Sequence, residues 1–456
     1  MATVTRENIS TLHDKITVKL AKEDYLPSFE KTLKQYAKTA NVPGFRKGMV
    51  PTGMVRKMFG QSVFSEEVLR SAGRELEQYL GAEKLAIFAQ PMLLPNEQPH
   101  KLDMNSPADV DFAFEIGLKP DFEIPAIASK AKLSQYKIAL SDKMLEDEIE
   151  RIKRRYGKVE DQVAVIGKDD ILYSTFEPCD AEGNPTGDKV EDTALVEKVP
   201  AKLQEMLMGK KAEDTIVFRP VDIAEGAELQ SFMKDPLKQP AEAAEQHFKL
   251  TITKVGLLVP RELDIELFSQ VFPNEVITTE ADFKERIRTE LGKEYDRISR
   301  ERLQNEMYEL LVHTTPVQLP ESFLKRWMRE GGEKPKSEGE VEQEFPGFVH
   351  QLLWTLISDK LIIDNKIEVT LEEVNADIKT RVLAYFGMET DEDAPWMEGY
   401  MAKVAKDQKT LDETYRRLLF DKLFLFLGTQ FTIEQKEVGE EEFFKLPDPH
   451  AAHHQH

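Results

Sequence analysis

Hydrophobic positions in the first 120 residues switch between a strand-like and a helix-like repeat. Residues 16–20 alternate between hydrophobic and polar, as in a strand with one buried face. Helical spacing follows over 29–40 and again over 55–85, where we expect a break near Gly60 because glycine weakens a helix interior. Alternation returns over 110–116. The pattern predicts an α+β domain over residues 1–120.

Residues 121–155 have the pattern of a connector. Leu133 to Ile138 can form a strand, and Ser141 is a suitable N-cap because its hydroxyl can accept a bond from the first turn of a helix. Hydrophobic residues then recur every three or four positions up to Tyr156, which predicts one buried helical stripe.

Two further regions and a tail complete the chain. Residues 156–258 contain short β-like runs separated by loops rich in glycine and proline, with a short helix over 200–208, which predicts a small antiparallel β-rich domain. Residues 259–445 repeat with helical spacing and predict an all-α domain. Residues 446–456 carry four histidines and are expected to form a disordered tail. The fold class is therefore α+β multidomain.

Composition and charge narrow the classes of function. The 456 residues are 41% hydrophobic, and 61 basic against 83 acidic residues give a net charge of −22, so the molecule as a whole repels nucleic acid and anionic membranes. A single cysteine, Cys179, excludes an intrachain disulfide and fits a reducing compartment. No segment has the roughly 20 apolar residues that span a bilayer, and the N-terminus lacks the pattern of a signal peptide. We expect a cytoplasmic protein that does not bind membranes.

One segment opposes the overall charge. Residues 41–60 carry four basic residues and no acidic one, a local charge of +4. Phe45 stands between Gly44 and Arg46, where an exposed ring beside cations suits a surface of RNA and protein. An ordinary basic loop explains this composition equally well.

The order of residues in this segment resembles a known family. Gly44, Phe45, Arg46, Lys47 and Gly48, followed by Val50–Pro51, are similar to the ribosome-binding motif of trigger factors, bacterial ribosome-associated chaperones. The strand and helix before the motif, the long helix after it, the strand-rich middle and the helical C-terminal region agree with that family over residues 1–445.

The resemblance implies a function for each region. Residues 1–120 would dock at the exit tunnel of the large ribosomal subunit, with Gly44–Gly48 contacting an exit-tunnel protein and rRNA. Residues 121–155 would link that domain to an FKBP-like isomerase domain over 156–258, and residues 259–445 would form a two-arm cradle for unfolded nascent polypeptides. Family members also self-associate, which implies a homodimer away from the ribosome. The candidate client-binding side chains are hydrophobic residues of the helical region, namely Met307, Phe323, Trp327, Trp354 and Phe386.

The FKBP-like region departs from the motifs of active family members. The family's Ile-Pro-Gly-Phe segment is replaced by Val199–Lys202, so that Lys202 would bring charge and water into the pocket. Tyr173, Phe176 and Phe218 remain as a vestigial pocket. We therefore expect weak or absent prolyl isomerase activity and name no catalytic residue.

Alternative functions remain open at this stage. One is an active prolyl isomerase with a secondary chaperone role, and the other is a holdase chaperone that does not bind ribosomes. The sequence has no phosphate-binding loop and no His/Glu pattern typical of a metal hydrolase, so we expect an ATP-independent protein with no cofactor and no metal site.

Overall fold

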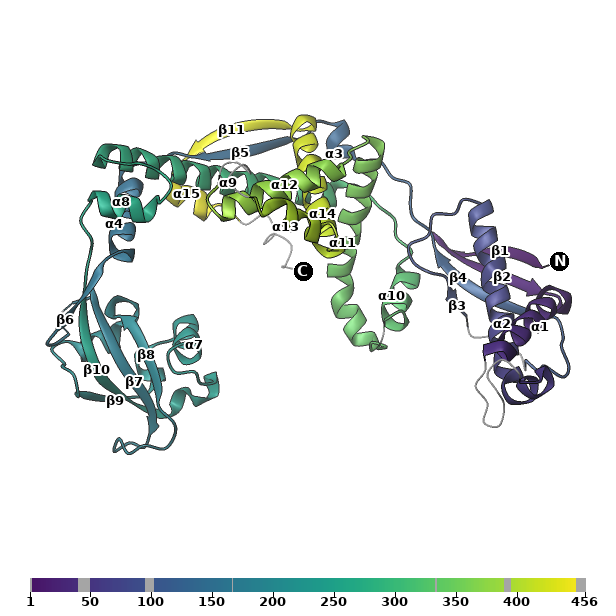
Figure 1. Ribbon diagram of the computed structural model, residues 1–456, viewed down its shortest axis with the longest axis horizontal. Coiled ribbons are helices and arrows are strands. Elements are labelled where there is room, and N and C mark those ends of the chain that lie inside the picture. The colour runs from purple at the N-terminus through teal and green to yellow at the C-terminus, as the bar shows by residue number, and fades with distance from the viewer. Residues whose placement is uncertain are drawn as a thin grey trace.

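The chain forms three regions that follow one another along an elongated molecule (Figure 1). The computed structural model describes residues 2–39, 50–94, 102–165, 167–332, 334–388 and 395–447. An N-terminal domain lies at one end, a β-rich domain lies at the other, and the helical C-terminal region lies between them.

The N-terminal domain packs two helices on a four-stranded antiparallel sheet of order β1-β2-β4-β3. The predicted strands over 16–20 and 110–116 are confirmed as parts of β2 and β4, which pair along their whole length. Strand β1 was not predicted; only one of its eight residues is even half-buried. The elements are β1 (Thr3–Ser10), β2 (His13–Leu20), α1 (Lys22–Thr39), α2 (Thr52–Ala82), β3 (Met92–Leu93) and β4 (Val110–Gly117).

The expected break near Gly60 is wrong, because α2 runs without interruption from Thr52 to Ala82. Gly60 is buried, and a Cβ added there would lie 2.8 Å from the sulfur of Met104. The glycine therefore provides room for a neighbouring segment, and does not end the helix.

The middle domain is a five-stranded antiparallel sheet around β10. Strand β10 pairs with β6, β7 and β9, while β8 pairs with the far side of β7. The predicted short helix over 200–208 is confirmed as α5. The elements are β6 (Lys158–Gln162), β7 (Asp170–Cys179), β8 (Val190–Leu195), η1 (Val196–Lys198), α5 (Ala201–Leu207), β9 (Thr215–Phe218), α6 (Pro220–Ile223), α7 (Gly226–Lys234), η2 (Ala241–Glu245) and β10 (His247–Val259).

The C-terminal region is mostly helical, as predicted, and also contains one strand. Its main core joins α9, α11 and α14 through leucines and aromatic residues. The elements are α8 (Ile265–Val271), α9 (Glu280–Thr314), α10 (Glu321–Glu330), α11 (Glu338–Asp364), α12 (Leu371–Tyr385), α13 (Met397–Val404), α14 (Gln408–Gln430), β11 (Thr432–Val438) and α15 (Glu440–Lys445). In the described ranges, no helix carries a run of apolar residues sufficient to cross a bilayer.

The segment expected to be a connector packs into the C-terminal region. It contains α3 (Pro125–Ala128), β5 (Lys132–Ile138) and α4 (Asp142–Arg155). Strand β5 pairs in parallel with β11 over seven residue pairs, and the stripe of α4 packs against α8 and α9. The Ser141 cap is confirmed, since its hydroxyl accepts a 3.2 Å bond from the Met144 amide. Residues 121–155 are thus fixed to the C-terminal region at two places, through strand β5 and through helix α4.

A buried junction joins the N-terminal domain to α10. Phe323 of α10 lies directly on β4, because a Cβ at Gly117 would be 2.4 Å from its ring. Beside this contact, Glu115 bonds His13 at 3.0 Å and Arg326 of α10 at 2.6 Å. His13 also pairs with Ser322 at 3.1 Å. Both an apolar contact and a hydrogen-bonded network therefore fix this end of the molecule.

Candidate functional site

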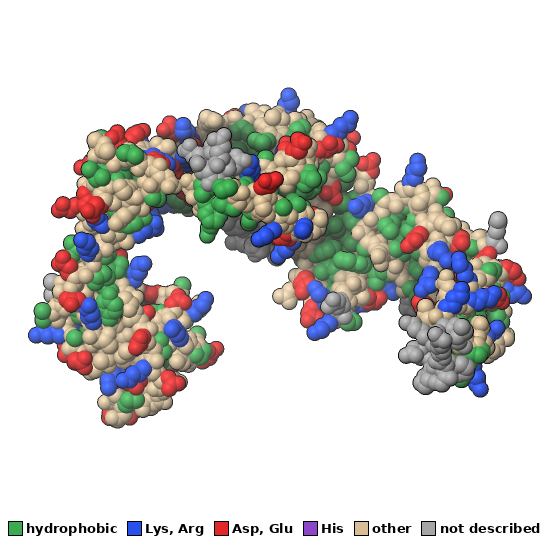
Figure 2. All heavy atoms as spheres, in the orientation of Figure 1, with side chains coloured by type: hydrophobic (Ala, Val, Ile, Leu, Met, Phe, Trp, Pro, Cys, Tyr) green, Lys and Arg blue, Asp and Glu red, His purple; other side chains and the backbone are tan. Residues whose placement is uncertain are grey.

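Four aromatic side chains form an exposed row at the junction of α12 and α13, which we call the aromatic ridge. They are Tyr385, Phe386, Trp396 and Tyr400, exposed by 84, 56, 38 and 40%. Successive ring centroids are 5.1, 5.0 and 6.2 Å apart, each pair edge to face. Figure 2 shows hydrophobic side chains on the underside of this part of the molecule. Exposed aromatic patches of this kind mark interaction surfaces.

The local backbone explains why these rings face solvent. Gly387 has φ +66°, and the amides of Gly387 and Met388 bond the carbonyls of Ala384 and Leu383 at 3.1 and 2.9 Å. This is the glycine-dependent termination of a helix, which turns the chain sharply after Phe386. Beneath the ridge, Leu383 and Met397 are buried against neighbouring methionines. The ridge is thus supported from below and open above.

A groove lies between α10 and α11, with a volume of about 910 Å³. Trp327 and Phe348 line it with their ring centroids 6.1 Å apart, and Lys336, Glu344 and Gln351 line it as well. The groove therefore offers two aromatic rings together with charged and amide side chains to a ligand.

The structure separates the five predicted client-binding residues. Phe386 lies on the ridge and Trp327 lines the groove. Trp354 is half-buried in a stack with Phe420 and Phe424, at 6.3 and 5.9 Å. Met307 and Phe323 are fully buried, so the expectation that they meet clients is corrected: their helical spacing reflects core packing. The exposure of Tyr385 and Tyr400 was not predicted, because nothing in their spacing distinguishes an exposed aromatic residue from a buried one.

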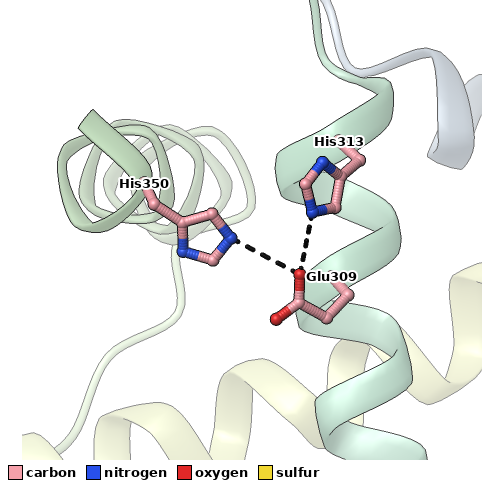
Figure 3. Close-up of side chains that lie close together, drawn as sticks. All are labelled: Glu309, His313 and His350. Atoms are coloured by element: carbon pink, nitrogen blue, oxygen red, sulfur yellow. Dashed lines mark hydrogen bonds and ion pairs between the residues drawn. The ribbon is translucent and has the colours of Figure 1, made fainter. Parts of the chain in front are cut away.

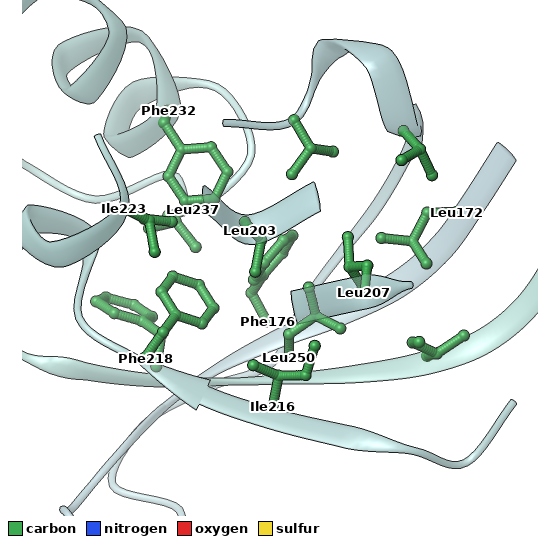
Figure 4. Packing of buried hydrophobic residues seen from close by; sticks show 14 of the residues in the cluster. Leu172, Phe176, Leu203, Leu207, Ile216, Phe218, Ile223, Phe232, Leu237 and Leu250 are labelled. Atoms are coloured by element: carbon green, nitrogen blue, oxygen red, sulfur yellow. The ribbon is translucent and has the colours of Figure 1, made fainter. Parts of the chain in front are cut away.

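The middle domain has a buried aromatic core. Phe176, Phe218 and Phe232 are buried and lie with ring centroids 5.9 to 6.3 Å apart. Figure 4 shows these rings among leucines and isoleucines of the sheet and the helices. Rings packed in this way stabilise the domain.

Tyr173 does not join that core. It points to the opposite face of β7, where Lys254 lies 5.8 Å from its ring centroid. The vestigial pocket predicted from Tyr173, Phe176 and Phe218 is therefore not assembled as a unit.

Lys202 is exposed, and its ammonium donates a 2.9 Å bond to the backbone carbonyl of Asp222. It therefore does not bring charge into the aromatic core. The Asp222 carboxylate receives two bonds from Arg219 at 2.8 and 2.9 Å, and the guanidinium holds the pKa of Asp222 below its usual value. The Lys202 bond ties α5 to α6 at the surface, whereas the Arg219 pair stabilises the single turn of α6.

The predicted ribosome-binding residues Gly44–Gly48 lie outside the described residues. The structure describes the chain on both sides, where α1 ends at Thr39 and α2 begins at Thr52. The first turns of α2 expose Met54, Lys57 and Met58, so a cation and two apolar side chains lie close together on this surface. Arg56 lies over the ring of Phe29 at 5.9 Å.

Comparison with known proteins identifies the family. Residues 2–152 match the family described as bacterial trigger factor protein, residues 160–260 match the trigger factor FKBP-like domain, and residues 299–446 match the trigger factor C-terminal domain. The chain belongs to the trigger factor family. It is accordingly a ribosome-associated chaperone with an FKBP-like domain.

Individual relatives agree over nearly the whole length. The trigger factor of Salinibacter ruber is 25% identical over 454 residues, covering 91% of this chain and 90% of the relative. The trigger factor of Chlorobium phaeobacteroides is 24% identical over 452 residues, covering 94% of this chain and 96% of the relative. A solved structure of the trigger factor chaperone covers 94% of this chain and all of its own, with 17% identity and a TM-score of 0.45.

Proposed function

We propose that this trigger factor shields nascent polypeptides on the aromatic ridge and in the groove beside Trp327, while Gly44–Gly48 bind the large ribosomal subunit in the cytoplasm. The observation that carries the proposal is the ridge of Tyr385, Phe386, Trp396 and Tyr400, which stays exposed although each ring could bury apolar surface. Unfolded chains of many sequences offer such apolar segments, and aromatic contacts do not require a particular sequence.

Weak binding at several places suits this task. A client that touches both the ridge and the groove gains from effective concentration, since the second contact is intramolecular. No nucleotide is needed, because each contact is reversible. Self-association away from the ribosome would cover the same apolar surface, and a homodimer is part of the proposal.

The ridge is tested by suppression of aggregation of a chemically unfolded client. We expect the triple variant Phe386→Ser, Trp396→Ser, Tyr400→Ser to require several-fold more protein for the same suppression. Phe444→Ser is a matched control, since Phe444 is 60% exposed and lies on α15. Equal suppression by the triple variant and the control would remove the ridge from the client site.

Docking is tested by co-sedimentation with ribosomes at increasing salt. Arg46 and Lys47 would pair with phosphates, so binding should weaken as salt rises. Replacing Phe45, Arg46 and Lys47 with alanine should abolish it, whereas Arg151→Ala, an exposed cation of α4, should not. If the triple alanine variant still sediments with ribosomes, the docking segment is wrong; failure of the unsubstituted chain to sediment at low salt would instead favour the ribosome-free holdase.

The FKBP-like domain serves this proposal as a spacer or binding module. The closed packing of Phe176, Phe218 and Phe232 supports that role, as does the position of Tyr173 on the other face of the sheet. Rings that are buried against one another leave little surface for a proline of a client, which disfavours the isomerase alternative.

A further inference from the structure

Two histidines and a glutamate from different helices converge in the C-terminal region. Glu309 and His313 lie one turn apart on α9, and His350 lies on α11. The Glu309 Oε2 atom is 3.0 Å from His313 Nε2 and 3.4 Å from His350 Nε2. Figure 3 shows a nitrogen of each ring turned toward the same carboxylate oxygen. Within the described residues, these are the only three such side chains whose ligand atoms lie within 4.8 Å of one another.

The two separations between the carboxylate and the imidazoles fit a metal ion. Zinc binds nitrogen and oxygen at about 2.0 to 2.1 Å with tetrahedral angles, which places neighbouring ligand atoms about 3.3 Å apart. The observed 3.0 and 3.4 Å lie on either side of that value. Imidazole and carboxylate are ligands that zinc and nickel accept.

A second contact orients one of the ligands. The Nδ1 atom of His350 lies 2.9 Å from the hydroxyl oxygen of Tyr308. When Nδ1 carries the proton and donates it to Tyr308, Nε2 presents its lone pair to the site. Outer hydrogen bonds of this type fix the tautomer and ring direction of metal-binding histidines.

The three side chains of the cluster differ in their exposure to solvent. Glu309 is buried, whereas the side chains of His313 and His350 are 38 and 30% exposed. An ion could enter from the histidine side and keep water in a remaining position, as open zinc sites do.

We propose that Glu309, His313 and His350 bind one divalent transition metal ion, which ties α9 to α11. The proposal does not depend on the proposed client or ribosome contacts. The expectation of no metal site came from the sequence, in which His350 is far from Glu309 and His313; α9 and α11 meet only in the folded chain.

The test is calorimetric titration of the full chain with ZnCl₂. The tail histidines His450, His453, His454 and His456 should first be replaced by glutamine, since they can bind metal themselves. We expect saturable binding of one zinc ion, with a Kd of about 1 μM or below, and a higher thermal unfolding temperature with zinc.

Substitutions locate the ion. His313→Gln and His350→Gln should each weaken binding at least tenfold and abolish the thermal shift, and Tyr308→Phe should weaken it about tenfold. The control is His247→Gln, in β10 of the distant domain. His313 is near the surface, so its variant should fold normally, which the unfolding curve without zinc checks. Absence of saturable binding, or binding unchanged by both histidine substitutions, would overturn the proposal and leave an ordinary helix ion pair.

Discussion

Phe323 and Phe386 provide a direct comparison, because both were predicted to bind clients and only Phe386 is exposed. Phe323 is fully buried, with its ring against Gly117 of β4 and edge to face with His13 at 5.7 Å. Truncating a buried phenylalanine to alanine costs about 3 to 5 kcal/mol through lost burial and a residual cavity. Phe386→Ala, on the exposed ridge, should change stability by less than about 0.5 kcal/mol.

Phe323→Ala should lower the stability of the junction between α10 and the N-terminal domain. Because a multidomain chain does not unfold in one step, the assay is hydrogen exchange of peptides from β4 and α10, together with urea unfolding. For Phe323→Ala we expect faster exchange in both peptides and unchanged suppression of aggregation. For Phe386→Ala we expect unchanged exchange and weaker suppression of aggregation. Unchanged exchange with reduced suppression for Phe323→Ala would refute the assignment of Phe323 to the junction.

Three further predictions concern other parts of the molecule. With this protein present, isomerisation of an Xaa-Pro peptide should still take tens of seconds, as it does without a catalyst. Faster isomerisation that is lost in Phe218→Ala would contradict the assignment of Phe218 to a buried core. Burial and a 2.5 Å bond to Glu440 raise the pKa of Tyr295 to about 12. The stability from that bond should be complete below pH 10 and lost as pH rises through about 12, so an absorbance titration should lose one late-titrating phenol in Tyr295→Phe. Ser141→Ala removes the cap on the Met144 amide and should lower the free energy of unfolding by about 1 kcal/mol in a denaturant titration, whereas an unchanged midpoint would show that the cap contributes nothing.

Local patterns account for the parts of the fold that the sequence predicted. The alternation over 16–20 and 110–116 reflects strands with one buried face, and the Ser141 cap depends only on the turn that follows it. The continuous α2 could not be predicted in the same way, because Gly60 is explained by Met104, which lies in a distant segment.

Contacts between segments far apart in the chain also determine which candidate residues are buried and which are exposed. The pairing of β5 with β11 joins Lys132 to Thr432, which are far apart in the chain, and no local repeat indicates it. Helical spacing cannot tell the buried Met307 from the exposed Phe386, since both recur with apolar neighbours. The motif at Gly44–Gly48 was informative for a different reason: it carries the family's own order of residues.

Crosslinking on translating ribosomes would show whether the ridge contacts nascent chains. A photoreactive amino acid would be placed at position 386 on the ridge, or at position 444 as the control of similar exposure, and the protein added to ribosomes carrying a stalled nascent chain. We expect crosslinks to the nascent chain from position 386, few from position 444, and loss of both when Phe45, Arg46 and Lys47 are alanine. Equal crosslinking from the two positions, or crosslinks from 386 that persist in the alanine variant, would contradict a client surface held at the ribosome by that segment.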